Sequence, residues 1–400
     1  MSDLALARSR TWATVDLDAV AHNVGAIRAR LPVGTTVMAV VKADAYGHGA
    51  VEVSHAAIDA GADSLGVATA DEAVELRSAG VRAPVLILGP IPDALIRQVI
   101  EADCAFTIAD ESFVPALRRD VAAGARVHLK VDTGMTRLGV ATDAVASVAQ
   151  AIDPTRVTVE GVFTHLACAD DPDPTMTRRQ LEAFEAAVRA VRARWPHARR
   201  HAAASAAALG IADAALDMVR IGIALYGVAP APHLTDPPLR AVMTMSSRVA
   251  RVRRVGRGTP VSYGATYRVP QDTTIVTVPV GYADGYPRAL SGVGRMLIAG
   301  RQAPIAGRVC MDYTMLDAGD AQVRDDEVVT VFGGELPAAA VAETAGTIAY
   351  ELFCRVGRRV PRLYLRGGQP VALRVAAVSS AQPLGAAAAA TTEAPSRRFR

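Results

Sequence analysis

Between Trp12 and about Arg240, short apolar runs alternate with longer segments in which apolar residues recur every three or four positions. The longer segments predict amphipathic helices, and the first of them precedes the first apolar run. Its apolar face consists of Leu17, Val20, Val24, Ile27 and Leu31. The runs that predict strands are Val37–Val41, Ser64–Ala68, Pro84–Leu88, Cys104–Ile108, Arg126–Val131, Thr158–Phe163, Arg200–Ala203 and Met218–Leu225.

This alternation predicts an α/β fold, because strands that alternate with helices form parallel sheets. About eight strand–helix units within roughly 230 residues favour a closed (β/α)8 barrel of the TIM type. An open, doubly wound sheet is the alternative, although no Gly-x-Gly-x-x-Gly motif follows the first strand.

After about Ala241 the pattern changes to one rich in Val, Thr, Arg and Gly, and helical periodicity is absent until about Ala338. Short apolar segments joined by Gly- and Asp-rich turns predict antiparallel strands. These segments are Met245–Val255, Thr273–Val280, Met296–Ile298 and Val328–Phe332. We therefore predict a barrel domain over residues 12–240 and a mainly antiparallel β domain over residues 241–378, to which residues 1–11 add a strand. The low-complexity segment 379–400 predicts a disordered tail.

Composition excludes several classes of function. A formal net charge of +3, without a basic stripe that carries aromatic residues, argues against nucleic-acid binding. The chain has no apolar run of about 18 residues, which argues against a membrane span. The charged N-terminus argues against a signal peptide. Four widely spaced cysteines form no metal-ligand cluster, so we expect a reduced cytoplasmic protein without a metal site.

The segment Ala39–Gly49 is the most informative in the chain. Lys42 ends an apolar run that predicts a buried strand, and a glycine-containing loop with Tyr46 follows it. An amine in this setting can lose its proton and attack a carbonyl group, so Lys42 is a candidate to form an imine with pyridoxal phosphate. The alternative is a strand-end lysine whose amine simply reaches water.

A phosphorylated cofactor needs an anion site, which this barrel usually places in the loops after its last two strands. There Gly222 permits close approach of the backbone, and Ser205 begins a helix with a free hydroxyl. A packing glycine and a helix N-cap are the structural alternatives. Arg220 lies among apolar residues and must be paired, either in an ordinary ion pair or with a cofactor ring nitrogen.

Three further candidates fall at or after predicted strand ends: Lys130, Arg137 and His165. Arg137 follows a strand in a glycine-containing loop and is suited to bind a carboxylate through its planar guanidinium. In the β domain, Pro260–Tyr267 and Pro279–Tyr286 place tyrosines beside glycines, although aromatic residues make up only 4% of the chain. Turn tyrosines that pack on strand edges are the alternative.

Taken together, these segments resemble the alanine racemase family of bacterial pyridoxal-phosphate enzymes, from about Trp12 to Leu365. The segment Val40–Gly49 is specific for that family. Val261–Gly264, Gly281–Gly285 and Cys310–Asp312 match family motifs in order and spacing. The resemblance implies an enzyme that interconverts L-alanine and D-alanine by a two-base mechanism and supplies D-alanine for the cell wall.

The resemblance assigns the two bases and the partner of the cofactor ring. Lys42 would hold pyridoxal 5'-phosphate as an internal aldimine and act as one base. Tyr263 would act as the other base from the partner subunit, which makes a homodimer the working unit. Arg220 would face the ring nitrogen and, as a group that keeps its own proton, leave that nitrogen unprotonated. His165 would link Tyr263 to Arg220.

The resemblance also implies how the phosphate and the substrate are held. Arg137 and the backbone N–H of Met311 would bind the carboxylate of alanine, and a carbamylated Lys130 would orient Arg137. The phosphate would be held by Tyr46, Ser205, Gly222 and Ile223.

Two positions depart from the family pattern. Arg358 stands directly before the Arg359–Arg362 motif, where a tyrosine that contacts the phosphate and restricts substrate size is usual. Ala204 replaces an asparagine that is common beside Ser205. The guanidinium of Arg358 could still bind the cofactor phosphate by a hydrogen bond, but it need not restrict substrate size. The change therefore keeps open a racemase of broader specificity, for serine or other small amino acids. A non-catalytic cofactor carrier and an amino-acid decarboxylase are further alternatives, which the β domain and Arg220, respectively, disfavour.

Overall fold

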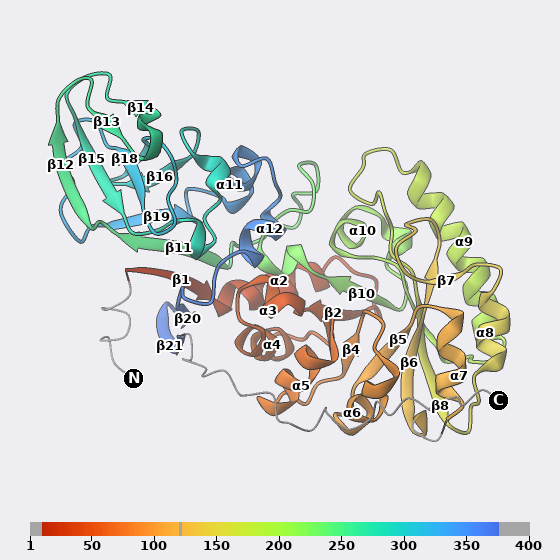
Figure 1. The fold of residues 1–400 in the computed structure, drawn as a ribbon. Helices are drawn as coiled ribbons and strands as arrows, with labels where there is room; N and C mark the ends of the chain where they lie inside the picture. The colour runs from red at the N-terminus through yellow and green to blue at the C-terminus, as the bar shows by residue number, and fades with distance from the viewer. Residues whose placement is uncertain (1–9, 120–121, 376–400) are drawn as a thin grey trace, which may run out of the picture.

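The computed structural model describes residues 10–119 and 122–375. Its N-terminal half contains eight parallel strands in the order β10-β2-β3-β4-β5-β6-β8-β9, with β7 beside β6 (Figure 1). These strands are β2 Thr36–Val40, β3 Ser64–Val67, β4 Val85–Ile87, β5 Ala105–Ile108, β6 Ala125–Asp132, β7 Val140–Ala141, β8 Val157–Phe163, β9 Arg199–His201 and β10 Met218–Ile221. The barrel predicted from the alternation of strands and helices is confirmed.

The two end strands approach each other and nearly close the barrel. The backbone N–H of Asp217 donates to the carbonyl of Arg200 at 3.1 Å, and that of Arg220 donates to Ala203 at 3.0 Å. The side chain of Asp217 adds an ion pair with Arg200 at 2.9 Å. This seam brings the ends of β9 and β10 together, where the sequence places Ser205 and Arg220.

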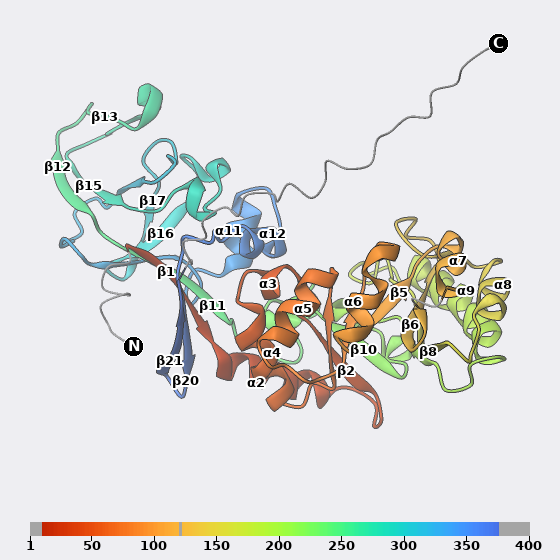
Figure 2. The ribbon, with the colours of Figure 1, turned by 60° about the horizontal axis from the view of Figure 1, so that its bottom comes forward.

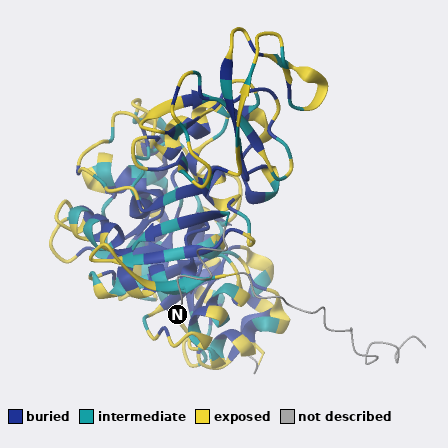
Figure 3. Ribbon diagram, turned by 90° about the vertical axis from the view of Figure 1, so that its left-hand side faces the viewer, coloured by how far each residue is buried: buried dark blue, intermediate teal, exposed yellow. Residues whose placement is uncertain are grey.

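Helices cover the outside of the barrel, because each connector presents an apolar face to the strands. They are α2 Leu17–Arg28, α4 Ala50–Asp59, α5 Ala70–Ser78, α6 Ile96–Glu101, α7 Val114–Leu117, α8 Val145–Ala151, α9 Thr175–Arg192 and α10 Ser205–Gly210. Short 3-10 turns are η1 Asp93–Leu95, η2 Glu111–Phe113, η4 Ala212–Ala214 and η5 Ile223–Tyr226. Buried positions follow the strands and the inner faces of these helices (Figure 3).

The C-terminal part is built from three smaller sheets, as the change of pattern after Ala241 predicts. A seven-stranded sheet has the order β17-β16-β19-β11-β1-β20-β21 and is antiparallel except between β1 and β20. The other sheets are β12-β15-β18 and the hairpin β13-β14.

Its strands are β1 Thr11–Asp16, β11 Met243–Arg248, β12 Arg251–Val255, β13 Pro260–Val261, β14 Tyr267–Arg268, β15 Thr273–Val278, β16 Arg295–Ile298, β17 Arg301–Pro304, β18 Thr314–Asp317, β19 Val328–Phe332, β20 Arg362–Arg366 and β21 Gln369–Arg374. Its helices and 3-10 turns are α11 Ala338–Thr344, α12 Ala349–Cys354, η6 Tyr263–Ala265, η7 Tyr282–Asp284 and η8 Arg288–Leu290.

The N-terminal strand β1 joins this β sheet rather than the barrel, between β11 and β20. The sequence places the added strand within residues 1–11, whereas β1 begins at Thr11, and residues 1–9 lie outside the described part. The predicted tail 379–400 also lies outside it. Through β1, the strands β20 and β21 come to lie beside α2 and α4 of the barrel (Figure 2).

Among the described residues, no helix has both the length and the apolar character needed to cross a membrane.

Candidate active site

Lys42 begins an unusual turn at the end of the first barrel strand. β2 ends at Val40, and the short helix α3, Lys42–Tyr46, follows in place of the irregular loop that the sequence predicts. Its residues 43 to 46 all have positive φ values, between 52° and 55°, so the turn is left-handed. None of the four is glycine, and this conformation costs an L-residue about 1–2 kcal/mol. Contacts from elsewhere in the fold must therefore hold the turn.

Two side chains close to the turn supply part of that support. The carboxylate of Glu72, on α5, accepts from the backbone N–H of Ala43 at 2.7 Å and from that of Ala68 at 2.6 Å. Nδ1 of the buried His48 lies 3.0 Å from the carbonyls of both Ala45 and Tyr46, to which it donates. Burial lowers the pKa of His48 to about 4, so this imidazole is neutral near pH 7.

Hydroxyl and backbone N–H groups converge where the last barrel strand ends. Ser205 Oγ accepts from the N–H of Gly222 at 3.1 Å and from that of Ala224 at 3.3 Å. The N-cap alternative for Ser205 is wrong, because Ala204 occupies the cap position and Ser205 is the first residue of α10. A Cβ built on Gly222 would lie 2.6 Å from the hydroxyl of Tyr46, so glycine is required for this approach.

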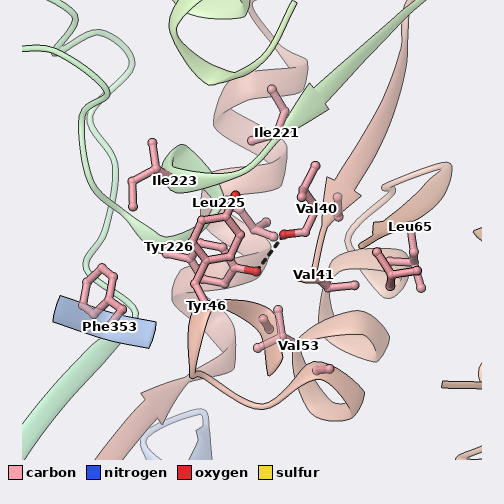
Figure 4. Packing of buried hydrophobic residues seen from close by; sticks show 14 of the residues in the cluster. Val40, Val41, Tyr46, Val53, Leu65, Ile221, Ile223, Leu225, Tyr226 and Phe353 are labelled. Atoms are coloured by element: carbon pink, nitrogen blue, oxygen red, sulfur yellow. Dashed lines mark hydrogen bonds between the residues drawn. The ribbon is translucent and has the colours of Figure 1, made fainter. Parts of the chain in front are cut away.

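Tyr46 is fixed among other aromatic rings at this point. Its ring centroid lies 4.8 Å from that of Tyr226 and 5.8 Å from that of Tyr350. The Tyr226 hydroxyl donates to the carbonyl of Val40 at 2.9 Å, which ties η5 to the strand before Lys42 (Figure 4). Burial raises the pKa of the Tyr46 phenol, so Tyr46 keeps its proton at neutral pH and can donate it in a hydrogen bond.

Arg220 is buried without a carboxylate partner in the described part of the chain. Its guanidinium donates to the carbonyls of His201, Thr164 and Ala202 at 2.7 to 2.9 Å. It also donates to Nδ1 of His201 at 2.9 Å and lies 3.4 Å from Nδ1 of His165. Burial lowers the pKa of Arg220 to about 9. The ordinary ion pair that the sequence leaves open for Arg220 is therefore wrong.

The two histidines beside Arg220 are held neutral. Burial, followed by the charge of Arg220, lowers the pKa of His165 to about 3 and that of His201 well below its usual value. His201 Nε2 in turn lies 2.8 Å from Nδ1 of His128. Because His201 Nδ1 accepts from Arg220, His201 must carry its proton on Nε2 and donate it to His128.

Lys130 and Arg137 complete a group of cations at the same mouth of the barrel. Lys130 is 6% exposed, and its Nζ lies 5.6 Å from the ring centroid of Phe163. Burial and the charges of Arg137, Arg220 and Lys42 lower its pKa to about 8, against the opposing charge of Asp132. Arg137 is exposed in the loop after β6.

This half of the site fits a phosphorylated aldehyde. Ser205 Oγ and the backbone around Gly222 form a cradle that a Cβ would fill, which suits phosphate oxygens. A guanidinium with no carboxylate partner among the described residues can donate an N–H to the lone pair of a ring nitrogen, and a primary amine can condense with the aldehyde. The excess of positive charge around Lys130 favours anionic groups.

The other predicted residues form a second, separate group on the β domain. Tyr263 lies in η6, between β13 and β14, and is 72% exposed, while Met311 is 54% exposed. Their loops contact each other, since Ser262 Oγ donates to the carbonyl of Arg308 at 2.7 Å and lies 3.7 Å from the Cys310 sulfur. Within one chain, this hairpin lies at the far end of the β domain from α3 (Figure 1). Ile223 is buried beside the cradle, and Arg358 is exposed between α12 and β20.

Several residues that shape the site carry no local signal in the sequence. Glu72, His201 and Tyr226 reach it from segments that the apolar pattern identifies only as strands or helices. Asp44 and Arg374 are joined by an ion pair across most of the chain. For His201 and Tyr226, the one signal in the sequence is a histidine or tyrosine within an apolar run, which indicates a buried polar group.

Comparison with known proteins agrees with this architecture. Residues 15–230 match the alanine racemase N-terminal domain, and residues 242–364 match the alanine racemase C-terminal domain. The alanine racemase of Symbiobacterium thermophilum is 45% identical over 90% of this chain and 97% of its own length. That of Desulfosudis oleivorans is 42% identical over 91% of this chain and 98% of its own.

Solved structures give the same result at the level of the fold. The Bacillus anthracis alanine racemase with bound L-Ala-P superposes with a TM-score of 0.86 at 35% identity, over 92% of this chain and 97% of that one. The enzyme from D-cycloserine-producing Streptomyces lavendulae gives 0.85 at 39% identity, over 90% and 98%. With both domains and the barrel site accounted for, the chain belongs to the alanine racemase family.

Proposed function

We propose that this protein interconverts L-alanine and D-alanine with pyridoxal 5'-phosphate as its cofactor, and so supplies D-alanine for the cell wall. The main support is the arrangement at the barrel mouth. There a lysine on a left-handed turn lies at the same end of the barrel as the cradle of Ser205 and Gly222, and as a guanidinium that has no carboxylate partner among the described residues. The family membership of the whole chain supports this assignment.

Lys42 would attach the cofactor, and Arg220 would face its ring nitrogen. Tyr46, Ser205, Gly222 and Ile223 would hold its phosphate. When bound, the cofactor supplies an electron-withdrawing group that makes the Cα proton of alanine acidic. Arg220 is locked by carbonyls and a neutral imidazole, so it cannot easily release a proton to the ring nitrogen. We infer that this limits side reactions that need a protonated ring.

Racemisation needs proton transfer on both faces of Cα, and therefore two bases. Lys42 would serve one face and Tyr263 the other. Because Tyr263 is exposed on the β domain, at the end away from α3, we propose that it acts in the barrel of a second copy, with His165 as its link to Arg220. Met311, exposed on a neighbouring loop, would bring its backbone N–H to the same partner site.

Arg137 would hold the substrate carboxylate, oriented by a carbamylated Lys130. A buried amine with a pKa of about 8 is partly neutral near pH 7 and so can react with carbon dioxide. The resulting carbamate would place a negative charge among Arg137, Arg220 and Lys42 and relieve their repulsion. Isotopically labelled bicarbonate should give a carbamate NMR signal that Lys130→Ala lacks, and a wild-type protein without that signal would exclude the modification.

Arg358 favours a second candidate, a racemase of broader specificity. It is exposed where a tyrosine restricts substrate size in the resembling family, and a flexible guanidinium fills that space less firmly. Serine racemisation at a rate comparable to that of alanine, reduced by Arg358→Tyr, would support this candidate.

Subunit complementation tests the function and the shared site together. Lys42→Ala and Tyr263→Ala should each abolish the interconversion of L- and D-alanine. When equal amounts are unfolded and refolded together, half of the dimers should be mixed, and each mixed dimer should contain one intact site. About a quarter of wild-type activity should return.

A site built within one chain predicts no recovery on mixing, and that outcome would refute the two-subunit arrangement. A wild-type protein that releases carbon dioxide from amino acids would be a decarboxylase. One that binds pyridoxal phosphate and turns over no amino acid would be a carrier.

A further inference from the structure

The turn that presents Lys42 contacts the last two strands of the chain, more than 300 residues away in sequence. Strands β20 and β21 belong to the β domain, but their side chains reach the segment from Asp44 to Gly49. Neither strand carries a residue of the cradle or the cation group described above. Their contacts with the turn therefore need a separate explanation.

The strongest of these contacts is an ion pair between Arg374, at the end of β21, and Asp44, in the middle of the left-handed turn. Nη1 of Arg374 donates to Asp44 Oδ1 at 2.7 Å, and Nη2 donates to Oδ2. Asp44 Oδ1 also accepts from the backbone N–H of Ala50 at 2.9 Å. One carboxylate thus joins the turn to the start of α4 and to β21.

The remaining contacts hold the far end of the turn. Arg362 is buried, and its Nε donates to the carbonyl of Gly47 at 3.1 Å. The rest of its guanidinium donates to the carbonyls of Val356, Gly357 and Val360. The hydroxyl of Tyr364 occupies the space that a Cβ on Gly49 would need. Arg362 thus mainly holds its own loop, whereas, within the described chain, the guanidinium of Arg374 donates hydrogen bonds to Asp44 alone.

The two planar groups favour this pairing on chemical grounds. An arginine fork matches both oxygens of a carboxylate, which a lysine ammonium cannot do. Burial opposes ionisation of Asp44, but the hydrogen bond and charge of Arg374 outweigh it and hold the pKa of this carboxyl below its usual range. Asp44 is therefore charged at neutral pH, two residues from Lys42.

We propose that Arg374 is a positioning residue, which acts through Asp44 to hold the left-handed turn and thereby aims the amine of Lys42 at the cofactor aldehyde. The proposal rests on the function proposed above. Four consecutive strained residues persist only where outside contacts over-determine them. Loss of the Arg374 fork leaves Glu72 and His48 in place, so the turn should loosen around Asp44 rather than unfold.

Arg374→Ala, Arg374→Lys and Asp44→Asn test this role, with Arg366→Ala as the matched control. Arg366 ends β20, is about half exposed and forms an ion pair with Asp59 at 3.8 Å, away from the turn. For each variant, the apoprotein is titrated with pyridoxal phosphate, the Lys42 adduct is trapped with borohydride and quantified by mass spectrometry, and kcat and KM are measured at saturating cofactor.

We expect Arg374→Ala to weaken cofactor affinity and to lower kcat, each by about tenfold, with little change in the KM for alanine. Asp44→Asn should have the same effect, and combining the two should add nothing, because both remove one interaction. Arg374→Lys should fall between Arg374→Ala and the wild type, and Arg366→Ala should match the wild type.

Values for Arg374→Ala equal to those of Arg366→Ala would overturn the proposal, as would a lower unfolding midpoint with unchanged cofactor affinity and kcat. If Arg374→Ala fails to fold, Arg374→Lys decides, and wild-type values for it refute the role. A wild-type protein that forms no Lys42 adduct would instead refute the proposed function, so the two failures are distinguishable.

Discussion

Ala43→Gly measures the strain in the turn after Lys42. Ala43 has φ 53° and ψ 49°, and its side chain is exposed, so the substitution removes no buried contact. Glycine would release about 1–2 kcal/mol of left-handed strain. It would also add about 0.5–1 kcal/mol of conformational entropy to the unfolded chain. Because the released strain exceeds this entropy term, by up to about 1.5 kcal/mol, we predict that Ala43→Gly stabilises the protein.

Urea unfolding of the apoprotein, compared with that of Ala186→Gly, is the appropriate assay. Ala186 is also exposed, but it lies in the middle of the regular helix α9, where glycine should cost about 1 kcal/mol. The same chemical change should therefore have opposite signs at the two positions. Equal destabilisation by both variants would show that the turn stores no strain, and would remove the reason why it needs outside support.

The activity of Ala43→Gly should change in the opposite direction to its stability. Glycine relieves the strain but also admits other backbone conformations beside Lys42, so the amine is aimed less precisely. We expect kcat to fall severalfold while the unfolding midpoint rises.

Three further predictions concern the cradle, the buried histidines and the junction between α2 and the barrel. In Gly222→Ala, the new Cβ would lie 2.6 Å from the Tyr46 hydroxyl, which must move to an ordinary contact distance of about 3.4 Å. This displacement should cost about 1–3 kcal/mol and weaken pyridoxal phosphate binding at least fivefold. Unchanged affinity in a titration would contradict the prediction. Folded His128, with a pKa of about 3, takes up no proton between pH 6.5 and 5, whereas the unfolded chain does, so stability should fall as the pH decreases through this window. His128→Gln should reduce that slope in urea unfolding, by up to about 1.4 kcal/mol per pH unit near pH 5, where the unfolded histidine is almost fully protonated. An unaltered slope would exclude a neutral folded His128. Asn23→Ala removes the side-chain hydrogen bonds to the carbonyl of Leu225 and to the N–H and carbonyl of Arg240. It should lower the free energy of unfolding by about 2–4 kcal/mol. A loss below about 1 kcal/mol would show that Asn23 does not stabilise this junction.

The strands could be located from the sequence because a buried parallel strand is a continuous apolar run. The run Val37–Val41 predicts β2, which spans Thr36–Val40, and Cys104–Ile108 predicts β5, which spans Ala105–Ile108. The weakest run, Arg200–Ala203, corresponds to β9, a strand of only three residues at the seam. A strand that is buried on both faces is apolar along its whole length, and this pattern can be recognised in a single sequence.

The backbone of the site could not be read in the same way. Left-handed residues are expected at glycine, asparagine or aspartate, but the turn after Lys42 contains two alanines and a tyrosine. Glu72 and Arg374 contact this turn, and neither lies near it in sequence. Ser205 shows the same limit, since its hydroxyl accepts from the neighbouring loop rather than capping its own helix.

The β domain therefore has two separate relations to the barrel. Through β20 and β21 it supports the turn of Lys42 in its own chain, as the hydrogen bonds of Arg362 and Arg374 indicate. In the function proposed above, the exposed hairpin that carries Tyr263 would offer a second base to another copy. A barrel without the β domain would lose both, and the first loss would already reach cofactor binding. We thus expect an isolated barrel to bind pyridoxal phosphate more weakly than the whole chain even where no racemisation is measured, since Lys42 would start a strained turn with half of its supports removed.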